Sequence, residues 1–79
     1  MDLPIQEVNY INPYSILVVT PKRLVRLYSP FEVQVIIPVD RLQLDQLVKV
    51  HQVQTNYEKL LVFLVDQKAY YHYHFMIIV

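Results

Sequence analysis

Two histidines separated by one residue, His72 and His74, are the side chains in this sequence best placed to do chemistry together. On a continuous β-strand, residues two apart project from the same face, so the two imidazoles could chelate one Zn²⁺, Cu²⁺ or Fe²⁺ ion. The third ligand would be His51 or a carboxylate such as Asp45 or Glu58. The flanking residues are Tyr and Phe, with no acidic residue close by to orient the rings. The sequence therefore favours two half-buried rings, and it leaves a metal site or a pH-responsive interface as alternatives.

A second cluster is basic and comprises Lys22, Arg23 and Arg26, close to Tyr28 and Phe31. A strand with this composition could contact phosphates and stack a base, as in small β-barrels that bind single-stranded nucleic acid. Charges spaced in this way are more often a solvated strand face or protect an edge strand from aggregation. Nucleic-acid binding is therefore kept as an alternative function, and nucleic acid is not the partner that we expect.

Residues suited to catalysis are scarce. The only serines, Ser15 and Ser29, lie in no nucleophile-like context, and the carboxylates fall at predicted turns or exposed strand positions. The chain contains no glycine, which excludes the phosphate-cradling loops and dinucleotide fingerprints that depend on it. We therefore expect that the protein is not an enzyme, that it has no catalytic residue, and that it binds neither a cofactor nor a small-molecule substrate.

The composition predicts one small domain over residues 1–79. Apolar residues make up 54% of the 79, which is enough for a core, and cysteine is absent, so no disulfide or thiolate metal site supplements that core. The seven Lys and Arg balance the seven Asp and Glu, so no net charge opposes association. The apolar runs are too short to cross a bilayer and the first residues lack signal-peptide features, which predicts a cytoplasmic protein.

The elements that must position these side chains are β-strands. Proline and small polar residues recur at short intervals, and the runs between them are rich in Val, Ile, Leu and Tyr. This pattern predicts an all-β fold, a single small antiparallel barrel or curved meander of about six or seven short strands. The predicted strands are residues 5–11, 15–20, 23–28, 32–37, 47–54, 58–65 and 69–79.

The segment from Asp40 to Val50 is ambiguous. Asp40 and Gln43 resemble a helix-capping box, and Leu44, Leu47, Val48 and His51 have helical spacing. The alternation of apolar and polar residues supports a strand nearly as well. We expect at most a short turn or one helical turn over Asp40–Asp45, followed by a strand over residues 46–54; a longer helix would make the fold α+β.

The last third of the chain is apolar on both faces of its predicted strands. Leu60, Val62 and Leu64 alternate with three further apolar residues, so this strand should be covered on both sides. A meander of 79 residues can hardly cover two faces of such a sheet, which makes the C-terminal hairpin a candidate interface. The residues expected to bind a partner are Phe63, Tyr70, Tyr71, Tyr73 and Phe75.

An alternative for the C-terminal run is a break at residues 72–75 into a 3₁₀ turn before a short final strand 76–79. The order of strands from Gln46 to Val79, with a turn at Asp66–Gln67, resembles small SH3-like barrels, although their glycine turns are missing. This resemblance of pattern implies a barrel-like arrangement and carries no functional residue.

The sequence therefore predicts a non-catalytic protein-protein interaction module or small subunit of a larger assembly. Its partner would be another protein or a second copy of the chain. An unpaired strand edge could also pair with another chain.

Overall fold

The computed structural model describes residues 6–79 and confirms an all-β, antiparallel fold. All nine strands lie within the β-branched and aromatic runs predicted from the sequence or extend beyond them by one residue, and β9 is the shortest. The strands are β1 (Glu7–Asn12), β2 (Ser15–Val19), β3 (Leu24–Tyr28), β4 (Phe31–Val35), β5 (Leu47–Val50), β6 (Gln52–Thr55), β7 (Leu61–Val65), β8 (Lys68–Tyr71) and β9 (Phe75–Ile77), with one 3₁₀ turn, η1 (His72–His74).

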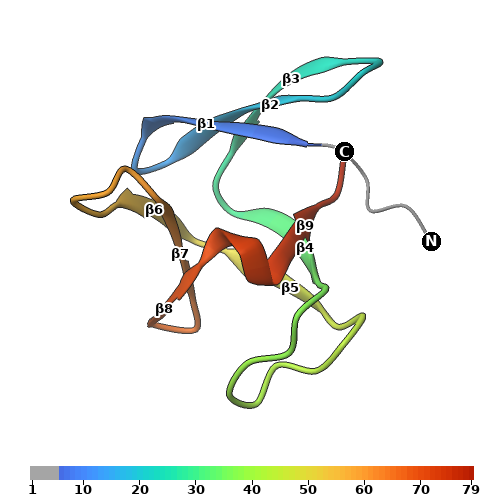
Figure 1. Ribbon diagram of the computed structural model, residues 1–79, viewed down its shortest axis with the longest axis vertical. Coiled ribbons are helices and arrows are strands. Elements are labelled where there is room, and N and C mark those ends of the chain that lie inside the picture. The colour runs from blue at the N-terminus through green and yellow to red at the C-terminus, as the bar shows by residue number, and fades with distance from the viewer. Residues whose placement is uncertain (1–5) are drawn as a thin grey trace.

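The strands form three three-stranded antiparallel sheets, ordered β1-β2-β3, β5-β4-β9 and β6-β7-β8 (Figure 1). The sheets surround a common core as an open arrangement, so the curved meander is found and the closed barrel is not. The single strand predicted over residues 47–54 is divided at His51, where its first half pairs with β4 and its second half with β7. This change of partner is one reason why there are nine strands instead of six or seven.

The C-terminal run is also divided, as in the broken alternative. The 3₁₀ turn η1 separates β8 from β9, and the final strand begins at Phe75, one residue earlier than expected. Phe75 and Ile77 are buried and pair with Val35 and Val33 of β4. Burying both side chains in the sheet of β4 requires the chain to leave the sheet of β7 and β8, and η1 makes that passage.

The ambiguous segment forms turns and no helix. Val39 and Leu42 form an isolated bridge in which each amide donates to the other's carbonyl, at 3.2 and 2.8 Å. Leu42 is buried in the core, which anchors the turn from within. The short turn expected over Asp40–Asp45 is thus found, followed by β5, which is the first half of the predicted strand.

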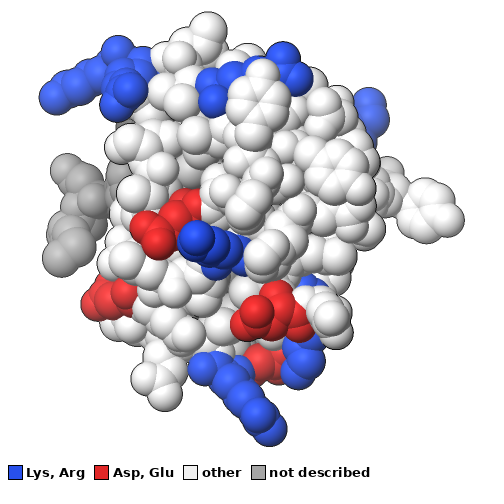
Figure 2. Space-filling view, turned by 180° about the vertical axis from the view of Figure 1, so that it is seen from behind, with Lys and Arg blue, Asp and Glu red and all other residues white. Residues whose placement is uncertain are grey.

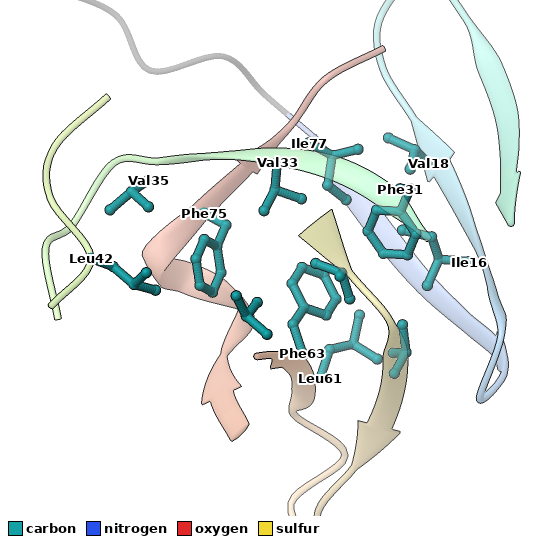
Figure 3. Packing of buried hydrophobic residues seen from close by; sticks show 13 residues of the cluster. Ile16, Val18, Phe31, Val33, Val35, Leu42, Leu61, Phe63, Phe75 and Ile77 are labelled. Atoms are coloured by element: carbon teal, nitrogen blue, oxygen red, sulfur yellow. The ribbon is translucent and has the colours of Figure 1, made fainter. Parts of the chain in front are cut away.

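Phe63 lies at the centre of the core, with 1% of its surface exposed. Its ring packs edge-on against Phe31, with centroids 5.6 Å apart, and tilted against Phe75 at 6.0 Å (Figure 3). Aromatic pairs at these separations contribute beyond the area that they bury. The remaining core side chains are aliphatic and come from all three sheets and, for Leu42, from the turn of residues 39–42: Ile16, Val18, Val33, Val35, Leu42, Val50, Val53, Leu61, Val65 and Ile77.

Within the part of the chain that the structure describes, five non-glycine residues take the positive φ values that glycine would ordinarily supply. Three are aspartates, the others being Lys59 and Gln67. Asp66 and Gln67, with φ of 50° and 66°, form the two-residue connection between paired Val65 and Lys68, as in a type I′ hairpin. The chain therefore builds tight turns without glycine and accepts local strain at these positions.

No helix long and apolar enough to cross a bilayer occurs within residues 6–79.

Candidate functional site

The outer face of the β6-β7-β8 sheet carries apolar side chains that the rest of the structure covers only in part. Side chains alternate along β7, so Leu61, Phe63 and Val65 enter the core while Val62 and Leu64 point outward and stay half-buried. Cross-strand pairing places uncharged neighbours beside both. We define the outer face as Gln52, Gln54, Val62, Leu64, Ala69 and Tyr71, a set without any charged side chain.

Two hollows lie on this face. One, of about 610 Å³, is lined by Gln52 and Leu64 of the outer face and by residues around it: Tyr14, His51, Asp66 and Gln67. The other, of about 250 Å³, is lined by Val62, Ala69 and Tyr71 together with Asn56 and Tyr70. Both hollows are lined in part by outer-face residues, so the face has recesses into which a partner's side chains could fit.

Tyr71 and Tyr73 stack on one another at the end of the outer face. Their ring centroids are 5.5 Å apart and the planes differ by 14°, with 42% and 48% of the two residues exposed. The ring of His74 lies 4.6 Å from that of Tyr73, and its Nδ1 is 2.9 Å from the carbonyl oxygen of Ile37. These contacts order the aromatic rings before any partner arrives, which lowers the entropic cost of binding.

Three residues of the predicted partner-binding set lie elsewhere. Phe63 and Phe75 are core residues and cannot belong to a docking surface. Tyr70 is half-buried against Phe75, with ring centroids 6.2 Å apart. Burial, a hydrogen bond to Asp40 and nearby carboxylates raise the pKa of the Tyr70 hydroxyl. Of the five residues predicted to bind a partner, Tyr71 and Tyr73 are the two that lie at the surface. The chain changes from β8 to η1 directly after Tyr71, and this change turns both rings outward.

Both histidines are half-buried, as favoured from the sequence, and they do not share the strand face that the metal alternative required. His72 and His74 lie in η1, and at three residues per turn two positions two apart point in different directions. His72 is half-buried, 6.5 Å from Phe63, and burial lowers its pKa. His51 lies between β5 and β6. Within residues 6–79 no group of three His, Cys, Asp or Glu side chains is close enough to hold a metal ion.

The predicted basic residues occupy the β2-β3 hairpin, away from the outer face. Lys22 and Arg23 lie at its turn, which Thr20 stabilises by accepting hydrogen bonds from both amides. The guanidinium of Arg26 lies 5.0 Å from the ring centroid of Tyr28 and donates a hydrogen bond of 3.3 Å to buried Ser15. Seen from behind, positive side chains lie at the end of the molecule that holds this hairpin, and positive and acidic side chains lie together over the middle and the other half (Figure 2).

Sequence reasoning anticipated part of the outer face and missed the rest. The apolar residues on both faces of the β7 run signalled Val62 and Leu64. Gln52, Gln54 and Ala69 carry no comparable signal, since only the register of β6 and β8 against β7 brings them beside those residues. Comparison of the chain with protein-family models, with curated proteins and with solved structures finds no match.

Proposed function

We propose that the protein is a non-catalytic protein-protein interaction module that binds its partner through the outer face and the stacked pair Tyr71–Tyr73. The observation that carries this proposal is the half-exposed, ordered tyrosine pair beside an uncharged sheet face. Tyrosine contributes a large rigid contact area and a hydroxyl, and it is enriched at interface hot spots.

The area of the outer face indicates whether its interface with a partner would be permanent or transient. The whole chain exposes 5670 Å², and a stable interface requires about 800 Å² from each partner. A three-stranded face of four residues per strand covers on the order of 200 Å² in projection, from strand spacings of about 4.8 Å and a rise of about 3.4 Å. The outer face by itself therefore favours a weak or transient partner, and a permanent dimer would need contacts beyond it.

The test is site-specific photocrosslinking in the native host's extract, with the photoreactive amino acid placed at Tyr71 in one variant and at Tyr57 in another. Tyr57 lies in the β6-β7 loop, is fully exposed, and serves as the matched control. We expect one discrete adduct from position 71 that the substitution Tyr73→Ser removes, and none from position 57. Equal adducts from both positions, or none from 71, would refute the proposal.

Self-association is measured separately by sedimentation velocity on the purified protein at tens of micromolar. A homo-oligomer that uses the outer face should dissociate in the Tyr71→Ser variant. A dimer unchanged in this variant would place the interface elsewhere and contradict the proposal.

A further inference from the structure

The β3 strand ends its sheet with one edge open. Within residues 6–79, β3 pairs with β2 and no strand pairs with its other side. Thr20 and Arg23 exchange two backbone hydrogen bonds, of 2.8 and 3.3 Å, and such bonded pairs recur at every second position of an antiparallel hairpin. The peptide groups of Leu24, Arg26 and Tyr28 are therefore directed away from β2, where an added strand could bond them.

The side chains of the same three residues share one face of the sheet. Leu24 and Tyr28 are 68% and 63% exposed, and Arg26 lies between them. The contacts of Arg26 with Tyr28 and Ser15 hold its guanidinium above the sheet. A strand added beside β3 would therefore lie next to the apolar side chain of Leu24, the cation of Arg26 and the aromatic ring of Tyr28.

The charged side chains of the β2-β3 hairpin are all cations, and Glu7 of β1 lies on the same face two strands away from Leu24. The residues of β2 that pair with the three positions are Val19, Leu17 and Ser15, none of them charged. Lys22 and Arg23 add two further cations at the hairpin turn. On the visible surface in Figure 2, the end of the molecule that holds this hairpin shows positive side chains and no acidic ones.

A second copy of the chain fits this edge poorly. Antiparallel pairing of two β3 strands about their centres would place Arg26 opposite Arg26, and like charges directly opposite one another destabilise a strand pair. Edge-strand cations commonly prevent self-pairing in this way. The same charges favour a strand that brings the opposite sign.

We propose that β3 binds an extended acidic segment of another protein by adding it to the sheet as an antiparallel strand. Directly opposite residues lie on the same face, so the segment would carry an acidic residue opposite Arg26 and an apolar residue two positions away on each side. The recognition pattern is apolar, any residue, acidic, any residue, apolar. Backbone hydrogen bonds supply affinity and these side chains supply specificity.

This surface is independent of the outer face, because β3 belongs to a different sheet from β6, β7 and β8. It goes beyond the proposed function, and either surface could fail its test without affecting the other.

The probe is a capped peptide, Thr-Val-Thr-Glu-Thr-Val-Thr, added to isotopically labelled full-length protein and followed by NMR. We expect shifts and slower hydrogen exchange at the amides of Leu24, Arg26 and Tyr28. N-methylation of the peptide backbone on its pairing edge should abolish binding, since it removes the donors. Shifts confined to Tyr71 and its neighbours, or binding unaffected by N-methylation, would overturn the proposal.

A charge exchange tests the central contact. Arg26→Glu should weaken binding of the Glu peptide at least about fivefold and make a Lys-centred peptide the better ligand. Arg26→Gln, which keeps a donor for Ser15, should give intermediate affinity for the Glu peptide if the first variant folds poorly. Arg41→Glu, the matched control in the turn of residues 39–42, should change nothing. Equal affinity of the native protein for both peptides, or binding of an oligothymidine in place of the peptide, would refute an acidic strand partner.

Discussion

The side-chain amide of Gln6 pairs with the peptide group of Ile77 as a neighbouring strand would. Gln6 Nε2 donates to the Ile77 carbonyl at 2.7 Å, and the Ile77 amide donates to Gln6 Oε1 at 3.0 Å. The two residues are 71 positions apart, so this contact joins the start of the described chain to its last strand. The two hydrogen bonds satisfy the amide and carbonyl of Ile77 on the edge of β9 that does not pair with β4.

Replacement of Gln6 by Leu should lower the free energy of unfolding by about 1–3 kcal/mol, because it leaves two half-buried peptide groups without partners. Chemical denaturation measures the change. Gln54→Leu, an exposed glutamine on β6, is the matched control and should shift stability by no more than about 0.5 kcal/mol. Equal effects of the two substitutions would show that the Gln6 contact contributes nothing specific.

The core position of Phe63 separates it from the tyrosines with which it was grouped. Phe63→Ala should cost about 3–5 kcal/mol, the range for removing a buried aromatic ring. Tyr73→Ala removes a half-exposed ring and should cost about 1 kcal/mol or less. Thermal unfolding of both variants measures the two losses of stability. A larger loss of stability in Tyr73→Ala than in Phe63→Ala would contradict this assignment of core and surface.

The strained turn at Lys59 predicts a stabilising substitution. Lys59 has a φ of 62°, where a Cβ atom is unfavourable, so Lys59→Gly should raise the free energy of unfolding by about 0.5–1 kcal/mol. Glu58→Gly, one residue earlier and outside the positive-φ set, should lower it by a similar amount through backbone entropy. The two denaturation midpoints should therefore move in opposite directions, and movement in the same direction would argue against strain at Lys59.

The burial of His72 predicts a pH-dependent stability. Burial lowers the pKa of His72 in the folded state, so the unfolded chain binds the proton more readily. Stability contributed by the neutral ring is complete above the unfolded value of 6.5 and decreases as the pH falls through 6.5 toward the lower folded pKa. The slope from one proton is at most about 1.4 kcal/mol per pH unit.

Denaturation between pH 7.5 and 5 measures this slope. His72→Phe should reduce it, whereas His51→Gln, which changes an exposed histidine, should leave that part of the slope in place. A slope that disappears with His51→Gln and persists with His72→Phe would reverse the assignment.

Local patterns in the sequence were sufficient to predict the fold class and where most of the strands lie. β-branched and aromatic runs end at Pro, Asn and Asp, and these signals depend only on neighbouring residues, so ten of the fourteen predicted run ends lie within one residue of an observed strand end. The apolar residues on both faces of Leu60–Val65 likewise indicated a sheet with an uncovered side, since strand alternation is a local property.

Only the tertiary structure decided which aromatic residues face the solvent. Phe63 and Tyr71 are equally apolar in a sequence pattern, but Phe63 enters the core against Phe31 and Phe75 while Tyr71 stacks outside on Tyr73. The bend at His51 and the turn η1 arise because strands must leave one sheet to bury residues in another. Such demands come from residues far apart in the chain, as with Gln6 and Ile77, and no local pattern contains them.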